Sequence, residues 1–210
     1  MLLVGLLALA RFALALAALD TASNFGGMGT SRELTFAALI EPALLLGIFA
    51  LALPIGSSSL GALVGDGGVT PARILALGSL FIVAIAETGR IPVDNPDTHL
   101  ELTMAHEGML LEYSGRPLGL LLWGTHVKQL VVLSLLAALF FPWGIAREVE
   151  LVALAIGLLS FLVELALLGV ALALVESSVA KLRIFRVPGL LGTASLLGLL
   201  AISSTYVMGR

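Results

Sequence analysis

The chain has 210 residues, of which 59% are hydrophobic and only 12% are charged, and its formal net charge is −3. A mean hydropathy of +1.10 excludes an ordinary soluble domain and is typical of a multi-pass membrane protein. The sequence contains no cysteine, which excludes disulfides and Cys-bound iron–sulfur clusters within this polypeptide. A small net negative charge without a basic tract indicates a lipid bilayer, and no nucleic acid, as partner.

The hydropathy pattern predicts an all-α fold, with about six membrane-spanning helices in a single transmembrane domain covering residues 1–210. About 20 apolar residues suffice to cross a hydrocarbon core of ~30 Å. The first predicted span could instead be a signal peptide, but it lacks a positive n-region and Arg11 interrupts it, which favours a membrane helix. The predicted spans are about 1–19, 34–53, 72–86, 118–141, 149–175 and 189–207.

Two features of the first half concern the backbone. Glycines at 26, 27 and 29 predict a turn-rich connection over residues 20–33. Inside the second span Pro42 follows Glu41, which predicts a helix kink beside the acid, because proline removes its own N–H and frees a carbonyl one turn back. A Gly/Ser-rich connection, 56–70, precedes the third span.

The most polar stretch of the chain is residues 87–117, here called the polar segment. It holds six carboxylates, two histidines and two arginines between two apolar runs. A connector needs only a few turn residues, so this composition predicts a functional segment. By the positive-inside rule, the basic residues of the odd-numbered connections predict that the polar segment is cytoplasmic and that both termini are periplasmic.

Ionisable residues also interrupt five of the six spans. A charge at a helix centre costs ~2.5–3.5 kcal/mol on insertion scales, so such residues usually face a bundle interior and mark ion pathways. The alternative is structural pairing, for example of Arg11 with Glu41 or of Lys128 with Glu164. The predicted ion relay comprises Glu41, Glu87, His126, Lys128 and Glu164.

Histidines and acids of the polar segment raise the question of a metal site. His106 and Glu107 lack the second histidine that a zinc-binding helix requires four residues on. His99 and His106 are seven residues apart, which is also not a ligand spacing of that type. The sequence therefore predicts no metal site.

The polar segment carries a recognisable motif. AETGRIPVDNP followed by HLELTMAHEGMLLEYSGRPL closely resembles the central signature of a membrane subunit shared by energy-converting [NiFe]-hydrogenases, of the formate hydrogenlyase and hydrogenase-4 type, and by respiratory complex I, where it is subunit 1. LDTASNFGGMGTSRELTFAALIEP, WGTHVKQLVVL and VESSVAKLRI also resemble the hydrogenase branch, so the resemblance covers nearly the whole chain. Members of the family usually begin with about two more membrane helices, and this chain starts at what looks like their third.

The resemblance implies the fold of complex I subunit 1 and a place in the cell inner membrane. It implies a membrane-anchor and ion-coupling subunit of a multi-subunit oxidoreductase, which docks the peripheral redox module and contacts antiporter-like membrane subunits. The [NiFe] centre and the iron–sulfur clusters are expected in hydrogenase-like large and small partner subunits, and no cofactor is expected in this chain. Quinone is not required by hydrogenase-type members.

By the same resemblance, the docking surface or quinone-like cavity is expected to include Arg32, Arg90, Asp94, Asp97, His99, Glu101, His106, Glu107, Glu112 and Tyr113. Two other readings remain open from the residues alone: a free-standing transporter or channel, and a passive membrane anchor. The coupling ion, H⁺ or Na⁺, is also open.

Overall fold

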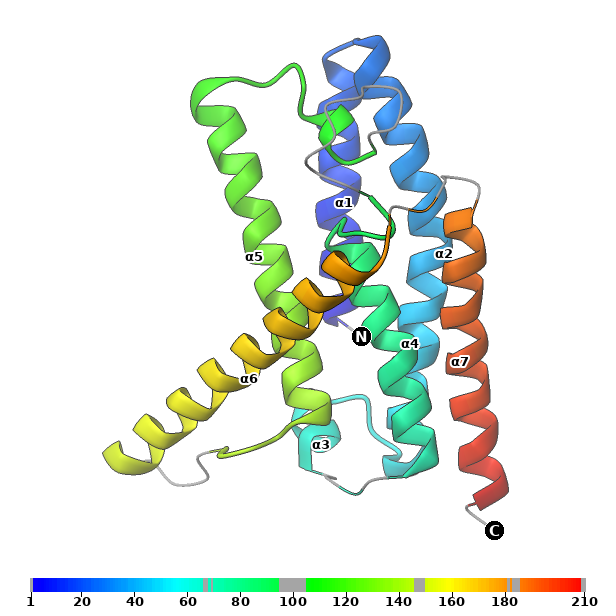
Figure 1. Ribbon diagram of the computed structural model, residues 1–210, viewed down its shortest axis with the longest axis vertical. Helices are drawn as coiled ribbons and strands as arrows, with labels where there is room; N and C mark the ends of the chain where they lie inside the picture. Colours follow the sequence, from blue (N-terminus) through cyan, green and yellow to red (C-terminus); the bar gives the residue numbers. More distant parts are fainter. Residues whose placement is uncertain are drawn as a thin grey trace.

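The computed structural model describes residues 2–65, 68, 70–94, 105–145, 150–180, 182 and 186–208. Every regular element in these residues is helical (Figure 1). The elements are α1 (Leu2–Asp20), α2 (Asn24–Ile55), α3 (Leu60–Gly65), α4 (Pro71–Glu87), the short 3₁₀ helix η2 (Glu107–Met109), α5 (Gly115–Phe140), α6 (Leu151–Ser178) and α7 (Val187–Met208).

Five described helices are long and apolar enough to cross a membrane: α1, α2, α5, α6 and α7. This confirms the predicted all-α, multi-pass membrane fold. The third predicted span corresponds to α4, which has only 17 residues and lies within the bundle, with residues from Ala72 to Glu87 buried along its length. The structure therefore has five such helices in its described part, where the sequence predicted about six spans.

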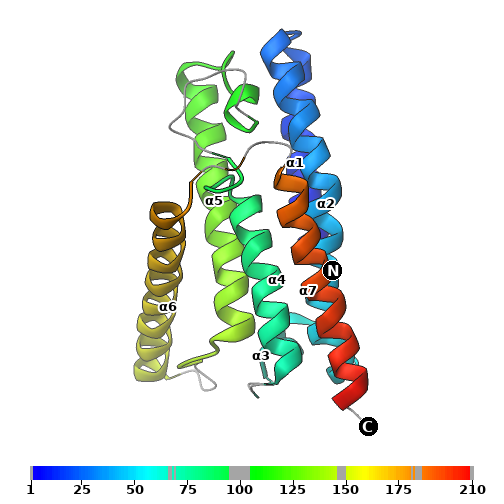
Figure 2. The same cartoon turned by 45° about the vertical axis from the view of Figure 1, so that its right-hand side comes forward.

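The centre of the bundle is formed by α2, α4 and α7, which lie side by side in both views (Figures 1 and 2). Small residues allow these helices to approach closely. A Cβ on Gly47 would lie 2.7 Å from the Leu80 side chain, and one on Gly198 would lie 2.9 Å from Cβ of Leu46. The Ser79 hydroxyl, fully buried, donates to the Ala194 carbonyl at 2.8 Å. Close packing and this hydrogen bond thus hold α4 and α7 together.

The outer helices are less covered. Helix α1 packs on α2, and α5 packs on α4 and α6. Figure 2 shows α6 beside α5, apart from the central three helices. Only Glu164, Leu168 and Leu172 of α6 are buried. The remaining surface of α6 is apolar and suits contact with lipid.

The predicted connection over residues 20–33 is wrong, because α2 begins at Asn24, ten residues before the predicted span at 34. Ser23 caps this helix: its Oγ accepts a hydrogen bond from the Gly26 N–H at 2.9 Å. The glycines serve close packing. A Cβ on Gly29 would lie 2.9 Å from the Ala105 carbonyl oxygen and 3.0 Å from the Met109 nitrogen. The glycine-rich stretch is therefore a helical surface on which η2 rests.

Pro42 lies inside α2, which runs unbroken from Asn24 to Ile55, and the kink beside Glu41 stays a prediction. The predicted connection 56–70 contains the short helix α3. The turn after α1 and the described residues 105–114 lie at the same end of the bundle (Figure 1).

Candidate functional site: a buried charge cluster beside a polar cavity

Arg11 is the centre of a buried charge cluster. It lies midway along α1 and is only 5% exposed. Its Nη1 donates to Glu41 Oε1 at 2.9 Å, its Nη2 donates to Glu87 Oε1, and its Nε lies 3.6 Å from Glu33 Oε1. The structural pairing of Arg11 with Glu41 is therefore confirmed, and two further acids share the same guanidinium.

Glu87 connects this arginine to α5. It is the last residue of α4 and is 5% exposed, and its Oε2 lies 2.9 Å from Lys128 Nζ. The alternative pairing of Lys128 with Glu164 is wrong, because Lys128 contacts Glu87 and Glu164 accepts a hydrogen bond from the Trp143 N–H at 3.1 Å. The reason is the register of α6 against α5, which sets Glu164 at the end of α5 and not beside its centre.

The cluster joins four helices through charges of opposite sign. Contacts run from Glu41 and Glu33 on α2 to Arg11 on α1, then to Glu87 on α4 and Lys128 on α5. With all five groups ionised, two positive and three negative charges leave a net charge of −1. Mutual pairing offsets the cost of burying each charge, while the odd carboxylate can take up a proton without leaving a cation unpaired.

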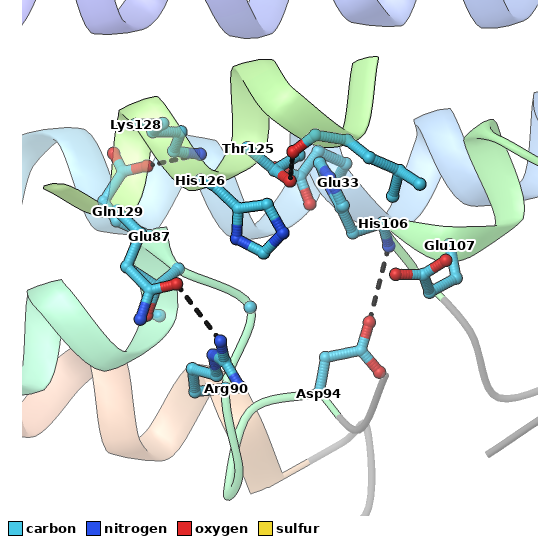
Figure 3. A pocket seen from close by; sticks show the side chains of 14 residues that line it. Glu33, Glu87, Arg90, Asp94, His106, Glu107, Thr125, His126, Lys128 and Gln129 are labelled. Carbon is cyan, nitrogen blue, oxygen red and sulfur yellow. Dashed lines mark hydrogen bonds and ion pairs between the residues drawn. The ribbon is translucent and has the colours of Figure 1, made fainter. Parts of the chain in front are cut away.

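A polar cavity of about 270 Å³ opens beside Glu87 and Lys128, which is room for several water molecules (Figure 3). The imidazole of His126 lies in the middle of this group, with Arg90 and Asp94 on one side of it. The polar lining residues are Glu33, Glu87, Thr88, Arg90, Asp94, His106, Glu107, Thr125, His126, Lys128 and Gln129.

The described parts of the polar segment form one wall of this cavity. Asp94, 6% exposed, accepts hydrogen bonds from the backbone N–H groups of Ala105 at 3.1 Å and of His106 at 3.4 Å. Arg90 Nη2 donates to Gln129 Oε1 at 3.1 Å, and its Nη1 lies 3.6 Å from Glu176 Oε1. The segment is thus tied to α5 and α6 while it faces the buried cluster.

The structure brings most predicted site residues together. Of the expected relay, Glu87, His126 and Lys128 line the cavity, and Glu41 is joined to it through Arg11. Glu164 instead lines a second cavity near the end of α5. Of the expected docking or quinone-like residues, the cavity includes Arg90, Asp94, His106 and Glu107.

The other predicted residues lie elsewhere. Tyr113 donates its hydroxyl to the Ala17 carbonyl at 3.0 Å, which fastens the end of the polar segment to α1. Glu112 is exposed at that end, and Arg32 is half-buried on α2. The predictions for Asp97, His99 and Glu101 fall on residues outside the described part of the chain.

Sequence reasoning misses Glu33 and the central role of Arg11. It places Glu33 in a connection, although Glu33 and Glu41 are eight residues apart and so lie on one stripe of a helix. An arginine in the middle of an apolar span is the available signal for a group of buried acids.

The chemistry of the site is that of charge pairing and proton transfer. Among the residues that the structure describes, no three His, Asp or Glu side chains gather as metal ligands. Carboxylates and an imidazole beside a space for water are suited to accept and release protons.

Comparison with known proteins places the chain among respiratory membrane subunits. A family model described as NADH dehydrogenase matches residues 1–207. Hydrogenase-4 component C of Escherichia coli (strain K12) is 40% identical over 183 residues, covering 85% of this chain and 57% of that protein. Formate hydrogenlyase subunit 4 of the same strain is 36% identical over 187 residues, covering 87% of this chain and 60% of that protein.

A more distant relative is a membrane component of the NADH-quinone oxidoreductase of Rhodopseudomonas palustris (strain BisB5). It is 32% identical over 149 residues, which cover 67% of this chain and 46% of that protein. The chain thus spans somewhat more than half the length of the two more similar relatives.

Proposed function

The chain belongs to the NADH dehydrogenase family of membrane subunits, and on this premise we propose that it is the membrane-anchor and ion-coupling subunit of a complex I-like energy-converting hydrogenase. In this role it docks a peripheral redox module and links electron transfer there to proton movement. The observation that carries the proposal is the contact between the polar segment and the buried charge cluster, through one shared cavity.

The first step of the argument is that events on the polar segment reach the cluster electrostatically. Asp94, Arg90 and Glu107 share a cavity wall with Glu87. A unit charge moved to ~7 Å from a carboxylate changes its energy by ~2 kcal/mol at an effective dielectric constant of ~20. That energy changes the population of the protonated form more than tenfold. Rearrangement of the polar segment during redox turnover is therefore sufficient to load or unload a proton.

The second step concerns the route. Water in the cavity meets His126 and Glu87, and the Glu87 carboxylate is shared by Lys128 and Arg11. On the far side of Arg11, the side chain of Glu41 is 40% exposed, whereas that of Glu87 is 2% exposed. Glu41 is thus the outer end of the cluster and Glu87 its buried centre. Proton carriers line the route, so we propose H⁺ as the coupling ion, with Na⁺ as the alternative.

The partners follow from the relatives. The hydrogenase-4 and formate hydrogenlyase proteins are named as components of multi-subunit assemblies. We propose hydrogenase-like large and small subunits, with the [NiFe] centre and iron–sulfur clusters, on the polar segment, and antiporter-like subunits within the membrane. The polar segment is cytoplasmic and the termini are periplasmic in this arrangement, and quinone is not required.

Docking is tested by replacing acids of the polar segment. Asp94→Ala combined with Glu101→Ala should reduce the peripheral subunits retained in purified membranes, because Asp94 holds the backbone of residues 105 and 106. Glu150→Ala is the matched control, because Glu150 is exposed at the beginning of α6. Unchanged retention in the double variant would contradict docking here. A stable lone oligomer that conducts solute would favour a free-standing transporter instead.

A further inference from the structure

A second cavity, of about 250 Å³, lies between the end of α5, the turn 141–145 and the first half of α6. Its walls are apolar except for one acid. The lining residues are Ala138, Pro142, Trp143, Ile145, Leu154, Gly157, Leu158, Phe161 and Glu164. Mostly apolar walls with one fixed charged group are the usual composition of a site for a small ligand.

Glu164 is held in place by the turn. It is 6% exposed, and its Oε1 accepts the Trp143 N–H at 3.1 Å. Gly144, at φ +65°, presses the turn against α6, since a Cβ there would lie 2.8 Å from the Ser160 Cβ. A carboxylate accepts several hydrogen bonds, so Glu164 has capacity for a donor that enters the cavity it lines.

This cavity is distinct from the polar cavity at the charge cluster. On α5 the polar cavity ends at Gln129 and the second one begins at Ala138. Nine residues of α-helix rise ~14 Å. The intervening residues 130–137 are apolar apart from Ser134, whose hydroxyl donates to the Leu130 carbonyl. Glu164 therefore needs an occupant of its own.

The mouth of the cavity faces the lipid side of the bundle. Trp143 is 56%, Ile145 50% and Leu158 62% exposed, although each lines the cavity. Trp143 follows the end of α5, the position of a residue at the membrane interface, where tryptophan is enriched. The Glu164 carboxylate reaches the same level through its hydrogen bond to Trp143. A headgroup can therefore meet the carboxylate while its acyl chains stay in the bilayer.

The chemistry of the walls selects the charge of that headgroup. A carboxylate attracts a cation, and the aromatic faces of Trp143 and Phe161 also favour one. A primary ammonium adds N–H donors for the free carboxylate valences. We propose that this cavity binds a phospholipid with a primary ammonium headgroup, phosphatidylethanolamine, with Glu164 as its counter-ion. The site is independent of the proposed coupling function.

The test is lipid retention by the purified full chain. The protein is exchanged into detergent with equal amounts of phosphatidylethanolamine and phosphatidylglycerol, and bound lipid is counted by native mass spectrometry. We expect wild type to retain phosphatidylethanolamine about tenfold over phosphatidylglycerol. Glu164→Gln should abolish that preference. Glu150→Gln, which removes an exposed acid from the beginning of the same helix, should keep it.

A second variant protects the test against misfolding. Ala138→Phe fills the cavity from α5 and leaves Glu164 intact, so it should also lower phosphatidylethanolamine retention. Absence of the preference in wild type, or its persistence in both variants, would overturn the proposal. Dodecylammonium is added as a competitor in a parallel sample. Glu164-dependent binding of this free amine without binding of phosphatidylethanolamine would also overturn the phospholipid assignment.

Discussion

Removal of Arg11 is the sharpest test of the charge cluster. Arg11→Met takes a cation away from three carboxylates and changes the net charge of the cluster from −1 to −2, since one positive and three negative groups remain. Breaking a buried ion pair from one side costs ~3–5 kcal/mol. In a protein of this size that corresponds to a melting temperature lowered by roughly 6–20 °C.

A double variant distinguishes charge from packing. Arg11→Met with Glu87→Gln leaves Lys128 with Glu33 and Glu41, so the net charge returns to −1. We expect the double variant to melt at a higher temperature than Arg11→Met alone. The measurement is tryptophan fluorescence during heating in detergent.

The control is Arg116→Met, because Arg116 is exposed at the first turn of α5. It should melt within a few degrees of wild type. An Arg11→Met protein as stable as wild type would refute the buried-cluster reasoning. A double variant less stable than the single one would show that shape, and not charge balance, decides the cost.

The remaining predictions concern coupling, packing and topology. Glu41→Gln should keep its hydrogen bond to Arg11 and the assembled complex but lose the pH gradient formed by vesicles during redox turnover, and a full gradient would contradict the proposed route. Lys128→Met should lose the gradient and also lower subunit content, because it leaves Glu87 with one cation fewer. Gly29→Ala should cost ~1–3 kcal/mol by overpacking against the backbone of residues 105–109, whereas Gly27→Ala, with open space around it, should not lower the melting temperature. Ser114→Cys should react with an impermeant maleimide only from the cytoplasmic face, and labelling from the periplasm would reverse the proposed topology.

The relay members that the sequence singles out show how far residue types alone carry. Glu87 and Lys128 are predicted because a charge in an apolar span is costly, and the structure places both at one cavity. The same reasoning selects Glu164, but the cost of burial says only that a partner exists, and the turn before α6 supplies a backbone N–H of Trp143 and a separate cavity.

The sequence by itself determined the all-helical membrane fold, because apolar runs of this length have few alternatives in a bilayer. It also located the family motif in the polar segment. Only the tertiary structure decided which charges meet. Arg11 and Glu87 are 76 residues apart along the chain, and hydropathy contains no information on which helix faces turn toward each other. The glycines at the start of α2 make the same point: glycine suits both a turn and close packing, and η2 resting on Gly29 selects the second use.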